Sequence, residues 1–196
     1  LTMENLSEYI IILSYMVFLS FSPGPNNILC SINGTRYGWA KTIPLISGMI
    51  AGFFLVGFFT SLSVEIIKEN GNILESMRYV CCSYLLYLSY MIIVDDPKKY
   101  KEDVEALESP MQFKTGFVMQ FINGKVIFYY IILMTVYASR LGEDYSIKFG
   151  LLVGATLVGV GAVSTWTTLG VFLRQFLSNE DKARRTNYIL GFLLTL

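Results

Sequence analysis

The chain has 196 residues, of which 54% are hydrophobic and 15% are charged, whereas soluble domains carry about 25% charged residues. The formal net charge is zero and no block of basic residues occurs, so nothing suggests a nucleic-acid partner. Three cysteines and no histidine argue against a disulfide framework and against a metal site, and we expect no cofactor.

Long uncharged stretches indicate helices that cross a membrane. No charge occurs in residues 9–35, 43–64, 79–94 and 149–173, and Lys125 is the only charge in residues 116–139. About 20 apolar residues are enough to cross the hydrocarbon core as a helix. We therefore predict an all-α, polytopic membrane helix bundle with six transmembrane helices, the last of them truncated. The expected helices are at roughly 6–33, 41–66, 73–94, 114–138, 147–173 and 184–196.

The first of these helices is interrupted by Pro23, Gly24 and Pro25, which Asn26 and Asn27 follow. Proline removes a backbone donor and clashes with the preceding helical turn. In a bilayer, a broken backbone is tolerated only where protein or a water-filled cavity satisfies the freed groups. We therefore predict a discontinuous helix with free N–H groups for a carboxylate and freed carbonyls for an ammonium. A zwitterionic amino acid offers both groups, whereas a plain proline kink is the simpler structural alternative.

The first helix is expected to close at the segment from Asn33 to Gly38. Gly34 and Gly38 are typical of a helix C-terminus, and Arg36 complements the helix dipole there. A gating role for these residues is an alternative that the sequence leaves open.

A charged segment, residues 95–113, separates two halves of the chain. It is rich in Lys, Asp and Glu and contains Pro97 and Pro110, which is typical of a solvated linker. We expect a single transmembrane domain over residues 1–196, with three helices in residues 1–94 and three in residues 114–196. An odd number of spans in each half predicts a 3+3 repeat of inverted topology.

The fourth helix repeats the interruption more weakly, at Gln120, Asn123, Gly124 and Lys125. Polar side chains at membrane depth are costly and usually face the interior of the bundle. Interrupted helices in corresponding positions of two halves are typical of a transporter whose binding site lies between them. Lys125 could instead extend to a membrane interface.

The distribution of Lys and Arg predicts the orientation. With the N-terminus outside, most of the basic residues between the spans lie on the inside, as the positive-inside rule requires. Glycines four residues apart, at Gly48 and Gly52 and at Gly150 and Gly154, indicate close helix packing and would also permit a homodimer.

The motifs S-P-G-P-N-N at 22–27, N-G-T-R-Y-G at 33–38 and Q-F-I-N-G-K at 120–125 resemble the LysE/RhtB family of amino-acid exporters. The resemblance extends over nearly the whole chain and is nearest to the cysteine and O-acetylserine exporter branch. It implies export of small amino acids from the cytoplasm across the bacterial inner membrane, driven by the proton motive force. It also implies that the translocation path is lined by Pro23, Gly24, Pro25, Asn26, Asn27, Gln120, Asn123 and Lys125. The family more often has N-P-K in the fourth helix, so Gly124 in place of proline implies a softer break.

Two other functions remain open, whereas an enzyme activity is not expected. In a non-transporting scaffold or a channel, broken helices with polar residues at membrane depth would be costly and would bind no substrate. A thiol redox carrier would need facing cysteines, whereas Cys30 stands alone and Cys81 and Cys82 are adjacent. The H-E-x-x-H, G-x-S-x-G and Walker sequences do not occur, so we expect no enzyme activity and no catalytic residue.

Without a Walker sequence, active transport is expected to be driven by an ion gradient. If protons drive transport, the proton carrier could be Lys125, the substrate or an acid near a helix end.

Overall fold

The computed structural model describes residues 3–69, 104–142 and 144–177, together with residues 76, 79, 83, 86, 87, 90 and 102. These residues form helices and connecting turns, with no strand among them, so the all-α prediction is confirmed for this part of the chain. The expected helix at 184–196 and most of the one at 73–94 lie outside the described residues.

Each predicted interruption divides one expected helix into shorter elements. The first half contains α1 (Met3–Phe21), α2 (Pro25–Tyr37) and α3 (Trp39–Glu69). The second contains α6 (Phe113–Ile122), α7 (Gly124–Ile132), the π-helical turn η1 (Leu133–Tyr137), α8 (Ala138–Leu141) and α9 (Tyr145–Leu177). The helices at both ends of each break are therefore separate elements with their own termini.

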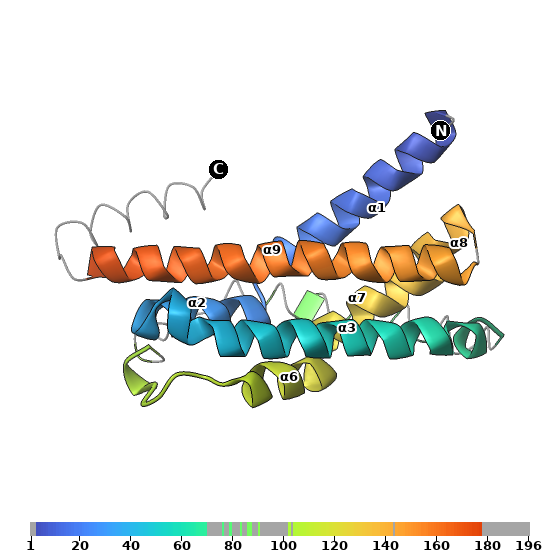
Figure 1. The fold of residues 1–196 in the computed structure, drawn as a ribbon. Coiled ribbons are helices and arrows are strands. Elements are labelled where there is room, and N and C mark those ends of the chain that lie inside the picture. Colours follow the sequence, from blue (N-terminus) through green and yellow to red (C-terminus); the bar gives the residue numbers. More distant parts are fainter. Residues whose placement is uncertain are drawn as a thin grey trace.

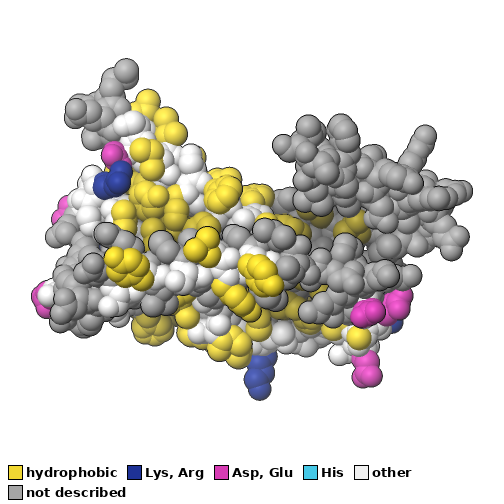
Figure 2. All heavy atoms as spheres, turned by 180° about the vertical axis from the view of Figure 1, so that it is seen from behind, with side chains coloured by type: hydrophobic (Ala, Val, Ile, Leu, Met, Phe, Trp, Pro, Cys, Tyr) yellow, Lys and Arg dark blue, Asp and Glu magenta, His cyan; other side chains and the backbone are white. Residues whose placement is uncertain are grey.

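Several of these helices meet the length and hydropathy expected of membrane spans. Three stretches qualify alone, namely Trp39–Val64, Gly124–Leu141 and Tyr145–Leu173. A fourth is the bent pair Leu6–Phe21 and Pro25–Tyr37, whose axes differ by 49°. Hydrophobic side chains cover much of the middle of the bundle in Figure 2, with few charged side chains among them. Such a surface matches a lipid environment.

The bundle is built on two long helices, α3 and α9, which run side by side (Figure 1). The short helix α2 packs against α9, whereas α6 packs against α3. Helix α1 contacts α9 near the break and then rises away from the bundle (Figure 1). An ion pair of 3.3 Å between Arg140 on α8 and Glu8 on α1 links the far part of α1 to the second half.

Glycine allows α3 and α6 to touch through their backbones. A Cβ built at Gly48 would overlap the carbonyl oxygen of Phe113, and one at Gly116 would overlap that of Leu45. Small residues permit this close approach where lipid offers no hydrophobic driving force between helices. The packing expected of Gly48 is therefore present, whereas a Cβ at Gly150 would meet no described atom within 4 Å.

The contact between α2 and α9 follows the same principle. A Cβ at Gly170 would overlap the backbone of Ser31, and one at Gly34 would lie 2.7 Å from the Thr167 carbonyl oxygen. The Thr35 hydroxyl donates to Gly170 O at 2.9 Å across this contact. Both short helices are thus held against a long helix at backbone distance.

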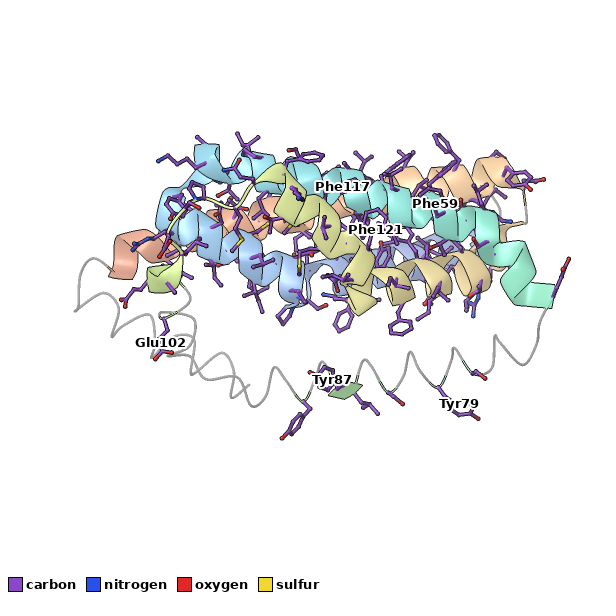
Figure 3. The ribbon with its side chains drawn as sticks, turned by 90° about the horizontal axis from the view of Figure 1, so that it is seen from below. Phe59, Tyr79, Tyr87, Glu102, Phe117 and Phe121 are labelled. Carbon is purple, nitrogen blue, oxygen red and sulfur yellow. The ribbon has the colours of Figure 1, made fainter. Side chains whose placement is uncertain are left out.

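Helix α6 has two chemically different faces. Gly116 and Gln120 are buried, while the rings of Phe117 and Phe121 lie 5.2 Å apart on α6 (Figure 3). The i, i+4 spacing places each pair on one side of the helix. The buried side carries Gln120 toward the breaks, which positions the functional site.

Candidate functional site

Asn27 closes the break in the first helix. Its Nδ2 atom donates to Ser20 O at 2.8 Å and to Ser22 O at 2.9 Å. These carbonyls belong to the last turn of α1, where a helix leaves acceptors without intrahelical partners. Asn27 is 4% exposed, so its amide takes the place of water at the end of α1.

The N-terminus of α2 stays open. Pro25 occupies its first turn, and no side chain caps it. Ile28 N donates to Gly24 O at 3.0 Å. The N–H groups of Asn26 and Asn27 lie nearer to the start of the helix, where no helical carbonyl precedes them to accept a hydrogen bond. This end therefore presents backbone donors and the positive end of the helix dipole.

The second break lies at Asn123, between α6 and α7. Its backbone is extended, with φ −82° and ψ 99°, and its Oδ1 accepts from Lys125 N at 3.1 Å. Val126 N donates to Asn123 O at 2.9 Å. Asn123 is therefore an N-cap of the kind that starts helices in soluble proteins, and Gly124 is the first residue of α7.

Three amides join the two breaks across about a hundred residues of sequence. Asn26 Nδ2 donates to Gln120 Oε1 at 2.7 Å, and Gln120 Nε2 donates to Asn26 Oδ1 at 3.2 Å. Asn123 Nδ2 donates to the same Asn26 Oδ1 at 3.1 Å. Gln120 Nε2 also donates to Gly116 O at 2.8 Å, which uses both of its hydrogens. Asn26 and Asn123 each keep one amide hydrogen without a partner among the described residues.

Lys125 connects the second break to the first. Its Nζ atom donates to Ser22 O at 2.8 Å and lies 3.5 Å from Pro23 O. The side chain therefore reaches the carbonyl end of α1. A cation at a helix C-terminus is stabilised by the dipole of that helix.

A cavity of about 60 Å³ lies between the breaks. One water needs about 10–15 Å³ of such volume, so the space suits several waters or a small solute. Polar residues line the cavity at the two breaks, and apolar residues of α3 and α9 line the rest of it. These apolar residues include Met49, Ile50, Phe53, Val160 and Val163.

Most of the binding residues predicted from the sequence meet at this cavity. Those that line it are Gly24, Pro25, Asn26, Asn27, Gln120, Asn123 and Lys125. Pro23 contributes its carbonyl oxygen to Lys125, and Gly124 starts the second half-helix beside the cavity.

Sequence reasoning missed several lining residues. The hydroxyls of Ser20 and Tyr129 are buried close to each other, and both residues line the cavity. Tyr129 lies four residues after Lys125, so helical spacing could have placed it on the same face. Thr156 on α9 also lines the cavity, and the sequence around it gives no comparable signal.

The segment expected to close the first helix lies farther along α2, away from the cavity. Gly38 ends the helix with φ 80°, as predicted, and its N–H donates to Gly34 O in the last turn of α2. Gly34 also allows the close contact with α9. Asn33 is fully buried, donates to Thr42 Oγ1 at 3.0 Å and accepts from Met111 N at 2.9 Å. Arg36 is exposed in the last turn of α2.

The remaining candidate chemistries gain no support from side-chain geometry. Cys30 is buried, with its Sγ 3.5 Å from the Met49 sulfur, and Cys81 and Cys82 lie outside the described residues. No group of three or more His, Cys, Asp or Glu residues gathers as metal ligands in the described part of the chain.

Comparison with known proteins agrees with the resemblance seen in the motifs. The family described as LysE type translocator matches residues 17–196. The cysteine/O-acetylserine efflux protein of Salmonella typhimurium (strain LT2) is 26% identical over 92% of this chain and 90% of its own length. The protein of the same name from Escherichia coli (strain K12) is 24% identical over the same shares. No solved structure matches.

Proposed function

Because the chain belongs to the LysE type translocator family, we propose that it exports small amino acids or related metabolites across the bacterial inner membrane. The observation that carries this proposal is the cavity between two broken helices, lined by an open helix N-terminus and by three joined amides. The names of the curated relatives point to cysteine and O-acetylserine as the first substrates to test.

The two ends of a zwitterion would bind to opposite backbone termini. The N–H groups of Asn26 and Asn27 offer donors and a positive dipole to the carboxylate. The carbonyl oxygens of Ser22 and Pro23 would accept from the ammonium. The spare amide hydrogens of Asn26 and Asn123 would then orient the substrate.

The cavity also favours a short, uncharged side chain. Its volume of about 60 Å³ is small, and its wall beyond the amides is formed by Met49, Ile50 and Phe53 from α3. Among the described residues no Asp or Glu lines it, so a cationic side chain would be desolvated there without a partner. Small polar or thiol side chains would fit best.

Transport would follow an alternating-access mechanism driven by protons. The two halves, residues 1–94 and 114–196, would be inverted three-helix repeats that rock around the breaks, with the N-terminus outside. The packing of α2 on α9 and of α6 on α3 supports this, because each half places a short helix against the long helix of the other. A homodimer is compatible with this arrangement.

Uptake into inverted membrane vesicles tests the proposed function. Labelled cysteine, O-acetylserine and serine should accumulate when a pH gradient, acidic inside, is imposed, and should not when a protonophore collapses it. Vesicles without the protein are the control. Equal uptake with and without the protein, for every small amino acid tried, would overturn the proposal.

Gly24→Val should slow efflux several-fold while leaving the protein folded. Gly24 has extended backbone, with φ −179°, which valine adopts without strain. An added Cβ would lie 3.0 Å from both Cδ and Nζ of Lys125, so the lysine must move away from Ser22. Efflux from cells, normalised to the amount of protein in the membrane, measures the effect. An unchanged rate would show that the position of Lys125 does not matter.

A further inference from the structure

The ammonium of Lys125 lies where the proposed binding mode needs the ammonium of the substrate. Nζ lies 2.8 Å from Ser22 O and 3.5 Å from Pro23 O, two carbonyls that directly follow the last residue of α1. We propose that Lys125 is an internal ligand, which fills the ammonium subsite in the empty transporter and is displaced when an amino acid binds. This inference rests on the proposed function and assigns a role to one side chain within it.

The site is shaped to receive the lysine side chain. Gly24 has no side chain, and a Cβ built there would lie 3.0 Å from the Cδ and Nζ atoms of Lys125, which is closer than ordinary van der Waals contact. The backbone of Lys125 is fixed separately, because its N–H donates to Asn123 Oδ1 at 3.1 Å. Only the side chain has to move when a ligand enters, so displacement need not disturb the second break.

The charge of Lys125 has no carboxylate partner among the described residues of the cavity. None of those lining residues is Asp or Glu, so the positive charge is stabilised by the carbonyls of Ser22 and Pro23 and by the dipole of α1. If Lys125 left these carbonyls and nothing replaced it, Ser22 O would keep only the bond from Asn27 and Pro23 O would lose the ammonium, and this loss of charged partners at a buried helix end is costly. A substrate ammonium removes this cost, because it makes the same two contacts.

The consequence is a difference between the loaded and the empty transporter. A loaded transporter crosses with the substrate ammonium on Ser22 and Pro23, whereas an empty one needs Lys125 there to make the return step. Net export requires the empty return. Exchange of external for internal substrate does not, because the transporter is loaded in both directions.

Lys125→Met separates these two modes in reconstituted vesicles. Methionine keeps most of the volume and removes the charge, so packing against Gly24 is retained. We expect net efflux to fall by about tenfold or more, the factor that corresponds to 1.4 kcal/mol, while exchange of labelled substrate continues. Lys114→Met is the matched control, because Lys114 is exposed on α6 and does not line the cavity.

Affinity provides a second readout. An internal ligand competes with the substrate, so its removal should tighten binding of labelled substrate to the purified transporter by severalfold. If Lys125 instead held the substrate, Lys125→Met would weaken binding, and the inference would be wrong.

Chemical rescue supplies a positive test. Lys125→Ala removes three carbons and the ammonium, a volume that n-propylammonium can fill. Millimolar n-propylammonium should restore part of the net efflux in this variant, whereas n-propanol should not. Failure of both compounds to restore efflux would count against the inference.

The outcomes also distinguish this inference from the proposed function. If the wild-type protein moves no amino acid in either mode, the proposed function fails and the inference fails with it. If the wild type transports but Lys125→Met loses exchange and net efflux equally, or keeps both, the function stands and the internal-ligand role is refuted.

Discussion

Asn27→Ala is expected to reduce net efflux by more than about tenfold while the protein still inserts into the membrane. The amide of Asn27 donates to Ser20 O and to Ser22 O at the end of α1, and because Ser22 O also accepts from Lys125 Nζ, Ser20 O is the carbonyl that depends most on this amide. Each buried carbonyl that loses its donor costs about 1–3 kcal/mol, and a tenfold effect needs only about 1.4 kcal/mol. The break would relax toward a shape that no longer holds the carbonyls at the cavity. Efflux of labelled substrate, normalised to membrane protein, is the measurement.

Asn27→Asp distinguishes loss of the donor from loss of volume. Aspartate has nearly the same shape but offers only acceptors to the two carbonyls when ionised. We expect it to be at least as defective as alanine. Wild-type efflux from either variant, at equal protein levels, would refute the role of Asn27 at the break.

Gly116→Val should have the largest effect on stability, lowering the free energy of unfolding by about 3 kcal/mol or more. A Cβ at Gly116 would overlap Leu45 O and lie 2.8 Å from Met49 N, and neither backbone atom can rotate away. Helix α6 would have to leave α3, and Gln120 would then lose its place beside Asn26. Thermal unfolding of the purified protein in detergent measures the loss.

Gly150→Val is the matched control, because it makes the same chemical change in α9 at a site where a Cβ meets no described atom within 4 Å. Its midpoint temperature should stay close to that of the wild type. Equal destabilisation by both variants would mean that helix propensity, and not the α3–α6 contact, sets the effect.

Local chemistry made the helix breaks predictable. Pro23, Gly24 and Pro25 cannot continue a helix, and α1 ends just before them at Phe21. The weaker signal at Asn123 and Gly124 was also sufficient, because an asparagine N-cap can start a helix without proline. The sequence therefore indicated where the backbone opens.

The partners across the breaks could not be predicted in the same way. Nothing in the sequence indicates that Lys125 reaches Ser22 or that Asn26 pairs with Gln120, because these contacts join segments about a hundred residues apart. Lys125 was expected to line the translocation path, to carry the proton or to extend to a membrane interface. Its observed contact with the α1 carbonyls depends on the angle between the broken helices.

Glycine spacing was an incomplete guide to packing. The pair Gly48 and Gly52 packs on α6 as expected, whereas Gly150 and Gly154 meet no described neighbour within 4 Å. Gly34 lies in the last turn of α2, as expected of a helix end, but it also packs against Thr167, which its position in the sequence did not indicate. The opposing helix decides which glycines are needed, and that helix is remote in sequence.

The hydrogen bond from Trp166 Nε1 to Phe21 O, at 3.0 Å, attaches α9 to the last residue of α1. The chain has only two tryptophans. The other, Trp39, is the first residue of α3 and donates to Thr168 Oγ1 on α9. Replacing Trp39 by phenylalanine would leave a single indole whose emission depends on its contact with the broken helix. The protein thus carries an intrinsic fluorophore at the point where the first half would move, and spectroscopy could follow the break without an added dye.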